Sequence, residues 1–160
     1  MPRRDPLLAE IEALYAGGYQ NFFRVARGIV GDRERATEAV QDAFTDAVRA
    51  RRTFRREGPL EAWVWRLVVN AARKAARRPL VEVGAWVEEL PPARELTELA
   101  PLIARLPERQ RLTVFLRYYA DLDYRAIAQV LEVELGTVSA ALAAAHAALR
   151  KSIREVETNG

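Results

Sequence analysis

The sequence predicts an all-α fold, with two small helical domains joined by a short linker and a helix-turn-helix in the second domain. Apolar residues recur every three or four positions along nearly every segment, which is the period of a helix that buries one face. No segment alternates apolar and polar residues as a half-buried strand does. The helical period breaks between Pro79 and Pro92, where proline and glycine favour a loop. We therefore predict a first domain over residues 1–78, a linker over 79–94 and a second domain over 95–160.

The first domain opens with a helix that Pro6 suits, because proline is tolerated in a first helical turn. Gly17-Gly18 is expected to weaken or kink this helix before the apolar pattern resumes. Gly31 then ends the pattern, and Asp32 suits the N-cap of a further helix over about residues 33–54. These breaks and caps set the predicted order of helices in the first half of the chain.

A third periodic segment predicts a helix over residues 59–78, with Pro59 in its first turn. Its apolar period predicts an inner face made of Leu60, Trp63, Val64, Leu67, Val68, Ala71 and Ala75. Trp65 then falls near the opposite, polar side of the helix. In the second domain the same period predicts helices over about residues 95–105, 108–120, 124–131 and 136–154.

Residues 106–150 have the pattern of a helix-turn-helix, and Ala128 is small where two helices of this motif cross closely. The buried side of the following helix is predicted to hold Val138, Leu142 and Leu149. The positions expected to face outward are Ser139, Ala140, Ala141, Ala143, Ala144, His146 and Ala147. After Thr137 no basic residue occurs before Arg150, so the arginines and lysines that usually hold such a helix on DNA are missing.

Composition argues against an enzyme, a metalloprotein and a membrane-inserted protein. Half of the 160 residues are hydrophobic and 29% are charged, which fits a folded core with a charged surface, and no apolar run is long enough to span a membrane. The chain has no cysteine and only one histidine, His146, which cannot form a zinc site alone. No glycine-rich phosphate loop or nucleophile motif is present. We expect no catalytic or metal-binding residues, no cofactor and a cytoplasmic location.

Positive charge is concentrated in one part of the chain, although the net charge is only +3. Residues 49–78 hold ten basic residues against two acidic ones, so a polyanion is expected to bind there. One stripe at helical spacing, which we call the arginine row, consists of Arg66, Asn70, Arg73 and Arg77. With Arg55, Arg56 and Trp65 nearby, this row suits a separated nucleic-acid strand. The alternative is a solvated face that keeps the domain soluble.

An acidic stripe of opposite sign lies in the preceding segment. This acidic line consists of Glu34, Glu38, Asp42 and Asp46, with Gln41 alongside. Like charges at this spacing destabilise a helix by a few tenths of a kcal/mol per pair, roughly, so the line suggests a basic partner. An ordinary solvated face, partly neutralised by Arg35 and Arg49, is the alternative explanation.

Two long segments resemble conserved regions of bacterial sigma factors. Residues 31–78, GDRERATEAVQDAFTDAVRARRTFRREGPLEAWVWRLVVNAARKAARR, resemble region 2 of the small extracytoplasmic-function group. Residues 106–150, LPERQRLTVFLRYYADLDYRAIAQVLEVELGTVSAALAAAHAALR, resemble region 4 of the same group. The two matches cover about residues 7–78 and 95–152 in the order and spacing of the family.

This resemblance implies two partners, core RNA polymerase and promoter DNA. The positions that it assigns to the polymerase are Glu38, Gln41, Asp42 and their neighbour Asp46. The positions that it assigns to the melted downstream promoter element are Arg55, Arg56, Trp63, Arg66, Asn70 and Arg73, and the same basic surface includes Lys74 and Arg77. The positions that it assigns to the upstream element in the major groove are Arg117, Arg125, Thr137 and Ser139.

The chain departs from the family in its helix-turn-helix. Glu132 replaces the glycine usual in the turn, and Glu134 replaces a capping serine, so the turn is expected to change geometry or to be strained. The family's lysine and arginines after Thr137 are absent here, and each lost phosphate contact weakens binding. We therefore expect a sigma-type initiation factor with weakened recognition of the upstream element.

The alanine-rich surface leaves a second hypothesis open. Small side chains allow another helix to approach closely, so Ala140, Ala144 and Ala147 are candidates for binding a protein partner, such as an anti-sigma factor. The alternative is that alanine is there because it is the best helix former. If a partner binds, the protein is a sigma-like regulator that acts through protein contacts, without promoter recognition by its second domain.

Overall fold

The structure of the chain, a computed structural model, describes residues 3–76 and 101–159. The first half contains α1 (Pro6–Val30), α2 (Arg33–Ala50), the 3-10 turn η1 (Arg51–Thr53) and α3 (Leu60–Ala76). The second half contains a helical turn over 101–104, α5 (Glu108–Tyr118), α6 (Tyr124–Leu131) and α7 (Leu135–Asn159). Within these two described ranges there is no strand, and the all-α prediction is confirmed. The linker predicted over residues 79–94 lies outside the described residues.

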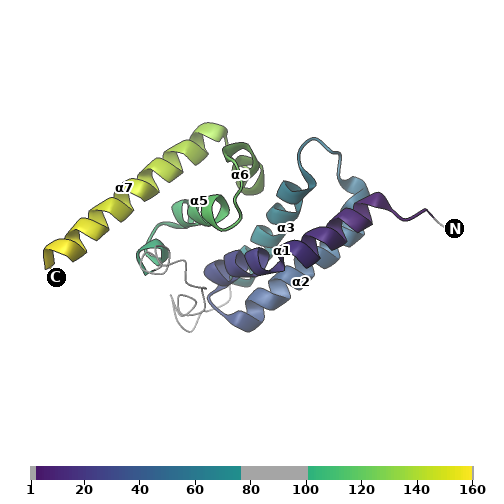
Figure 1. Cartoon of the computed structure of the whole chain (residues 1–160), viewed down its shortest axis with the longest axis horizontal. Helices are drawn as coiled ribbons and strands as arrows, with labels where there is room; N and C mark the ends of the chain where they lie inside the picture. The colour runs from purple at the N-terminus through teal and green to yellow at the C-terminus, as the bar shows by residue number, and fades with distance from the viewer. Residues whose placement is uncertain (1–2, 77–100, 160) are drawn as a thin grey trace.

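Helices α1, α2 and α3 pack side by side as the first half of the molecule (Figure 1). Aromatic rings join them, because Phe22 of α1 lies 4.2 Å from Trp65 of α3 and 5.1 Å from Phe44 of α2 between ring centroids. The predicted break between α1 and α2 is confirmed. Gly31 adopts a left-handed φ of 80°, and the Asp32 carboxylate accepts a hydrogen bond from the Arg35 backbone N–H.

Gly17-Gly18 does not interrupt the first helix, because α1 continues through both glycines to Val30. A Cβ on Gly18 would lie 2.9 Å from Cε2 of Phe22, so a larger residue would displace that ring from the core. Gly18 thus allows close packing against the Phe22 ring.

The inner face of α3 is wider than the apolar period predicts, and the side assigned to Trp65 was wrong. Leu60, Val64 and Val68 are buried as expected, but Trp63 and Leu67 are only half-buried. The residues buried in their place are Ala62, Trp65, Val69 and Ala72. The reason is that α3 packs against α1 and α2 and also against α6, so more than one side of it is covered.

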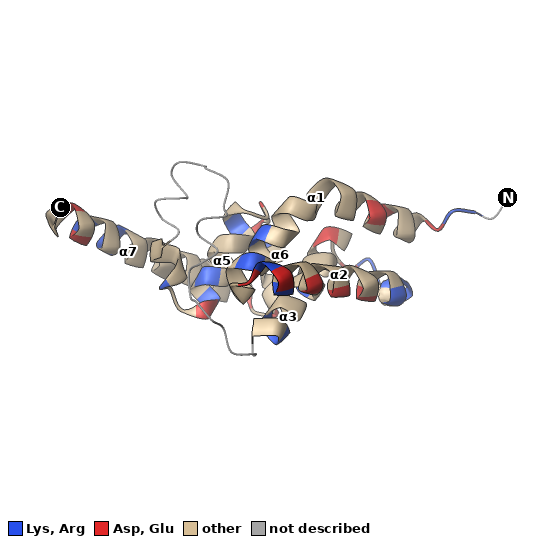
Figure 2. Cartoon of the chain, turned by 90° about the horizontal axis from the view of Figure 1, so that it is seen from below, with Lys and Arg blue, Asp and Glu red and all other residues tan. Residues whose placement is uncertain are grey.

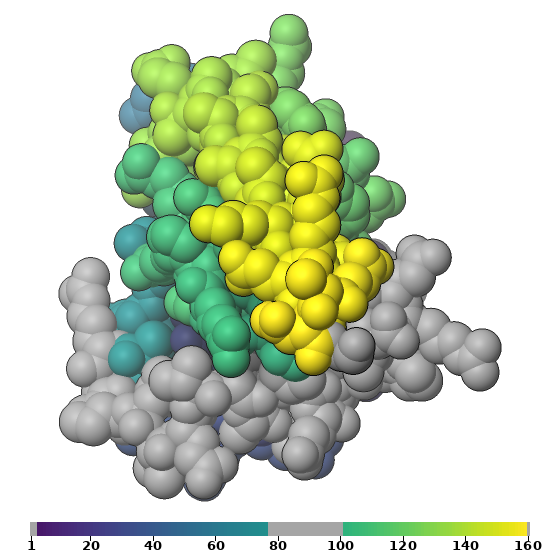
Figure 3. Space-filling model, turned by 90° about the vertical axis from the view of Figure 1, so that its left-hand side faces the viewer, coloured from purple at the N-terminus to yellow at the C-terminus, as the bar shows by residue number. Residues whose placement is uncertain are grey.

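The second half has the predicted helix-turn-helix, in which α6 and α7 meet at an angle of 103°. Val138, Leu142 and Leu149 are buried as predicted, whereas Ala141 is also buried and does not face outward. Figure 3 shows α7 from its C-terminal end, lying over α5. Among the described residues no single helix is long and apolar enough to cross a membrane; α6 and α7 meet that test only when taken together as a bent pair.

The two halves of the molecule touch mainly where α3 meets α6, and also where α1 meets α5 (Figure 1). The second contact is close, since a Cβ on Gly28 of α1 would lie 2.8 Å from Cε2 and Cζ of Phe115 on α5. Only a residue without a side chain fits at Gly28 while Phe115 holds this position. One continuous set of buried side chains extends through both halves.

Candidate nucleic-acid interface

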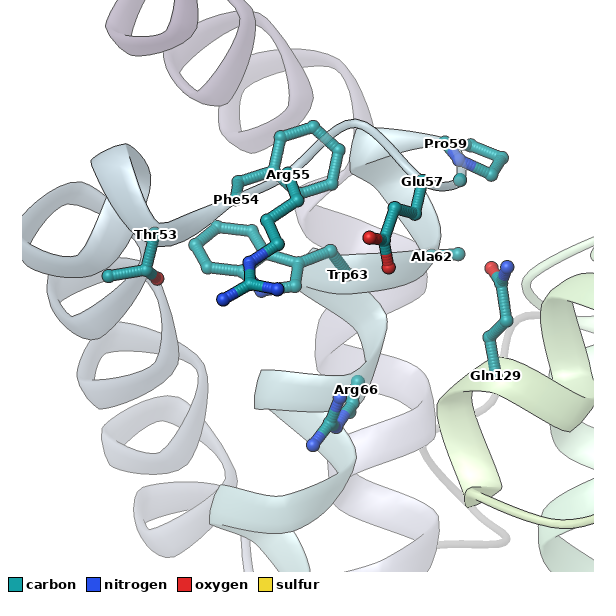
Figure 4. Close-up of a pocket in the computed structure, with 10 residues that line it drawn as sticks. Thr53, Phe54, Arg55, Glu57, Pro59, Ala62, Trp63, Arg66 and Gln129 are labelled. Atoms are coloured by element: carbon teal, nitrogen blue, oxygen red, sulfur yellow. The ribbon is translucent and has the colours of Figure 1, made fainter.

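A hollow of about 400 Å³ lies where the loop after η1 meets the start of α3 (Figure 4). We call it the loop hollow, and it is lined by Thr53, Phe54, Arg55, Glu57, Gly58, Pro59, Ala62, Trp63, Arg66 and Gln129. Nine of these residues come from one continuous stretch of the first half. Gln129 alone comes from α6 in the second half.

Two aromatic rings, Phe54 and Trp63, form one wall of the loop hollow, with centroids 5.4 Å apart and planes inclined by 43°. Both side chains are half-buried, so their faces remain partly available to a ligand. The guanidinium groups of Arg55 and Arg66 lie beside them (Figure 4). Aromatic faces next to cations suit a flat, unstacked nucleobase attached to a phosphate backbone.

Ion pairs fix the loop that forms this hollow. Arg56 adopts a left-handed φ of 54°, and its Nη2 lies 3.3 Å from Oε1 of Glu10 on α1. Arg56 therefore faces α1, and it is not among the residues that line the loop hollow. Just before the loop, Nε of Arg51 lies 2.7 Å from Oδ2 of Asp5, whose Oδ1 caps α1 at the Leu7 backbone N–H. The hydrogen bond from Arg51 holds the pKa of Asp5 below its ordinary value of 3.8.

The described members of the arginine row, Arg66, Asn70 and Arg73, are exposed on one face of α3 as predicted, and Lys74 is exposed beside them. Arg77 lies outside the described residues. Both arginines, however, form ion pairs with carboxylates of the second half. Nη2 of Arg66 is 2.5 Å from Oε1 of Glu132, and Nε of Arg73 is 2.7 Å from Oε1 of Glu108.

The residues assigned to upstream DNA are spread over three helices of the second half. Arg117 on α5 forms an ion pair with Asp121 at 3.4 Å, and Arg125 is exposed on α6. In the first turns of α7, Ser139 is exposed and Thr137 is half-buried. The three alanines proposed for a protein partner, Ala140, Ala144 and Ala147, are all exposed along α7.

The turn between α6 and α7 carries the backbone strain that the sequence predicts. Glu132 has φ 56° and ψ 46°, in the left-handed region, and its N–H bonds to the carbonyl oxygens of Ala128 and Gln129. Glutamate thus adopts the geometry that glycine would adopt more easily. Farther along α7, His146 is half-buried and shares a hydrogen bond of 2.8 Å with the hydroxyl of Tyr118, which fits a boundary residue.

The acidic line is exposed along α2, as predicted, and basic residues lie at both ends of the helix (Figure 2). Gln41 belongs to the same surface and also lines a second hollow of about 560 Å³, which we call the α2 hollow. Its apolar part comes from Tyr15 and Phe44, whose rings meet edge to face at 5.0 Å. Tyr15 is 38% exposed, so part of its ring is available to a partner at this surface. Acidic and apolar groups therefore lie side by side on α2.

The structure adds residues that sequence reasoning missed. Phe54 forms a wall of the loop hollow, although the sequence places it only at a helix end. Phe54 and Trp63 stand on either side of the Gly58-Pro59 turn in the sequence. That turn is the one sequence signal that could have indicated that the two rings meet. Glu108, Gln129 and Glu132 approach the arginine row from the second half, and no sequence pattern links them to α3. In the described part of the chain no three His, Asp or Glu residues are grouped to hold a metal ion.

Comparisons with known proteins match both halves. The family model "Sigma-70 region 2" matches residues 14–79, and "Sigma-70, region 4" matches residues 96–149. The chain is 29% identical over 154 residues to the ECF RNA polymerase sigma factor SigM of Mycobacterium tuberculosis, covering 92% of this chain and 79% of that one.

Two solved structures have a similar fold. CnrH in complex with the cytosolic domain of CnrY has a TM-score of 0.73 at 22% identity, covering 93% of this chain and 96% of that one. The sigma factor RpoE of Bartonella quintana, in complex with the anti-sigma factor NepR, has a TM-score of 0.72 at 17% identity, covering 91% of this chain and 97% of that one.

Proposed function

Because the chain belongs to the sigma-70 family, in its extracytoplasmic-function group, we propose that it recruits core RNA polymerase to promoters and holds a base of the melted strand in the loop hollow. This is a family of transcription factors without enzymatic activity. Such a factor acts on the polymerase, and so in the cytoplasm. The observation that carries the proposal is the Phe54–Trp63 wall with Arg55 and Arg66 beside it.

The loop hollow has the size and chemistry for one extruded base. Stacking between a base and an aromatic side chain is worth roughly 1–3 kcal/mol and tolerates any base, because every base has a flat face. Glu57 and the Arg55 guanidinium supply an acceptor and donors for the edge of that base. The arginine row continues from the hollow along α3, so the flanking phosphates would follow Arg66 and Arg73.

The polymerase would bind on the other side of the first half, at α2. The acidic line offers carboxylates to a basic helix, and Tyr15 and Phe44 in the α2 hollow offer apolar area next to it. Interfaces combine a buried apolar centre with a polar rim, and this surface has both. The proposed contacts are Glu38, Gln41, Asp42 and Asp46.

Upstream recognition by the second half would be weak. The α7 surface that follows Thr137 presents Ser139, Ala140 and Ala143 where phosphate-binding cations are needed. Arg117 and Arg125 are the remaining cations assigned to upstream DNA, and Arg117 is already paired with Asp121. We propose that downstream contacts at α3 dominate promoter binding.

The test uses core polymerase from the source organism, with promoters selected from fragmented genomic DNA by run-off transcription. Asn70→Ala and Arg66→Ala are expected to reduce permanganate reactivity of the melted strand about tenfold, while co-purification with core polymerase is unchanged. Arg154→Ala, an exposed arginine far along α7, is the matched control. Normal strand opening by both α3 variants would refute the assignment of the melted strand to this surface.

The second candidate is a regulator that binds polymerase or another protein without initiating transcription. The exposed row of Ala140, Ala144 and Ala147 favours it, because a partner helix can pack closely on such a surface. Both structural neighbours are solved in complex with partner proteins, one of them an anti-sigma factor, so we propose an anti-sigma factor as the partner of this chain too. Binding to core polymerase without run-off product from any selected promoter would favour this candidate.

A further inference from the structure

The last turns of α7 extend past the helices that cover the rest of it. Leu149 is the last buried residue of α7, and the helix continues from there to Asn159. We call residues 150–159 the α7 tail, which is about 15 Å long at the usual helical rise per residue. Figures 1 and 2 show this end of α7 extending away from the other labelled helices.

The apolar stripe of α7 continues onto the tail, where it is no longer covered. Leu142, Leu149 and Val156 recur every seven residues, which is the period of a helix that packs along another helix. The first two are buried, because α5 and α6 pack against α7. Val156 is 64% exposed, and Ile153 beside it is only half-buried. The tail therefore offers an apolar stripe to a further helix.

Charged residues border this stripe in a fixed order. The part of α7 before the tail contains no Lys, Arg, Asp or Glu, so all charge of this helix lies on the tail. At 3.6 residues per turn, Arg150 and Glu157 fall on one edge of the stripe. Lys151 and Glu155 fall on the other edge. On each edge, a basic residue precedes an acidic one along the chain.

These four charged side chains are available to a partner. All four are exposed, and within the described ranges, 3–76 and 101–159, no ion pair involves any of them. A partner helix that matches them must carry an acid opposite each base and a base opposite each acid. A second copy of the tail, running in the opposite direction, has this pattern.

The order of the charges distinguishes the two ways in which two tails could pack. In an antiparallel pair related by a two-fold axis, the same edge of each helix faces its counterpart. Arg150 then meets Glu157 of the partner subunit. Lys151 likewise meets Glu155 of the partner subunit. In a parallel pair, opposite edges would face each other, so base would meet base and acid would meet acid. Charge therefore favours the antiparallel pair.

Both charge pairings agree on one centre of the contact. The midpoint of each pairing falls at Ile153 or next to it along the helix. The two-fold axis thus places Ile153 against Ile153 of the partner subunit, with one Val156 on each side of that contact. The pairing ends at Arg150, directly after the last buried residue of α7. It therefore uses the uncovered turns and leaves the core of each copy unchanged.

We propose that two copies of this chain associate through an antiparallel contact between their α7 tails, with Ile153 and Val156 at the centre and the four charged residues at the edges. Two helical turns on each side make a small interface, and interfaces below about 1,200 Å² hold weak, transient complexes. We expect a Kd of roughly 10–100 μM. At nanomolar concentrations the chain is then a monomer, so polymerase binding by labelled chain is measured on the monomer.

Sedimentation equilibrium of the full chain, over about a hundredfold range of concentration around this Kd, measures the association. Wild type is expected to change from monomer to dimer over that range. Val156→Glu should weaken the dimer at least tenfold, roughly, because it places a carboxylate at the apolar centre. Leu135→Glu, at an exposed leucine in the first turn of the same helix, is the matched control and should dimerise as wild type does. A wild-type monomer at every concentration, or equal weakening by both substitutions, would overturn the contact.

Reversing charges tests the edges of the contact. Glu155→Lys with Glu157→Lys makes both edges basic, and Arg150→Glu with Lys151→Glu makes both edges acidic. Each double variant alone should dimerise about tenfold more weakly than wild type, because like charges now face each other. An equal mixture of the two should recover the wild-type affinity. A mixture as weak as the separate variants would show that these edges do not meet.

Disulfide cross-linking tests the direction of the two tails. The chain has no cysteine, so single cysteines report on one position each. Ser152→Cys lies next to the proposed centre and should cross-link two copies. Thr158→Cys should not, because antiparallel packing separates the two copies of this residue by about 15 Å along the helices. Cross-linking at Thr158→Cys as efficient as that at Ser152→Cys would indicate parallel tails and refute the antiparallel pair.

Discussion

Arg66 on α3 and Glu132 at the end of α6 form an ion pair, with 2.5 Å between Nη2 and Oε1. The pair joins a proposed DNA-binding arginine to the turn of the helix-turn-helix, where Glu132 has the left-handed backbone that glycine favours. Glu132 thus takes part in two features of the chain, a left-handed turn and the pairing of one arginine of the row.

Glu132→Gly and Glu132→Gln are expected to differ in stability. Both lose the pair with Arg66, but only glycine relieves the left-handed φ of 56°. The glycine variant should therefore be more stable than the glutamine variant by about 1 kcal/mol in urea unfolding. Equal free energies of unfolding would show that the turn stores no strain at this position.

Trp63→Ala is expected to weaken binding of single-stranded DNA by the holoenzyme by about tenfold, because one face for base stacking is lost. Trp63→Phe keeps an aromatic ring beside Phe54 and should retain most of the affinity. Fluorescence anisotropy with a labelled strand measures both. A phenylalanine variant as weak as the alanine variant would argue against stacking.

Glu38→Lys with Asp42→Lys reverses charge in the middle of the acidic line and is expected to lower the affinity for core polymerase at least tenfold, roughly. Glu155→Lys with Glu157→Lys makes the same change in net charge at the exposed end of α7. Titration of labelled protein with core polymerase distinguishes a local contact from a general charge effect. An equal loss of affinity in both double variants would show that α2 is not part of the polymerase interface.

Ser139→Arg with Ala143→Arg restores cations to the exposed side of α7. Each new phosphate contact is expected to add roughly one unit to the slope of log K against log salt, and upstream duplex binding should rise accordingly. A footprint of the holoenzyme should then extend upstream of the melted region. If the wild-type footprint already extends that far, the proposal of weak upstream recognition is wrong.

Asp5→Asn is expected to destabilise the protein at pH 7 and to have little effect in strong acid. Arg51 lowers the pKa of Asp5 in the folded state, so this contribution is present above the unfolded pKa and is lost as pH falls through the folded one. Asparagine still caps α1, whereas Asp5→Ala loses the cap and the ion pair together and should lower Tm further. A Tm difference between wild type and Asp5→Asn that persists at pH 2 would contradict this origin.

Much of the fold is predictable from sequence because helix caps and apolar periods are local. Gly31 ends α1 and Asp32 caps the start of α2, as their local sequence predicts. Gly18 misled the prediction, since its role depends on the Phe22 ring and not on its own conformational freedom. Local patterns therefore predict where helices form better than they predict why a glycine is present.

The candidate site was predicted only in part, because α3 has three neighbours. The apolar period predicts one buried face, with Trp63 inside and Trp65 near the polar side, whereas Trp65 is buried and Trp63 is half-buried. The ion pairs of Arg66 and Arg73 join exposed residues from separate halves of the chain. Such pairs leave no periodic trace in sequence, and they can be found only once both halves have been placed.

The bracing of Arg56 against Glu10 has a consequence for how quickly the loop hollow can be filled. A binding loop that must order itself pays an entropic penalty, about 0.5–1.5 kcal/mol for each immobilised side chain. Here the ion pair and the left-handed backbone of Arg56 hold the loop in one shape before any strand arrives, which would lower that penalty. The aromatic wall would then meet an arriving base in the arrangement that stacking requires.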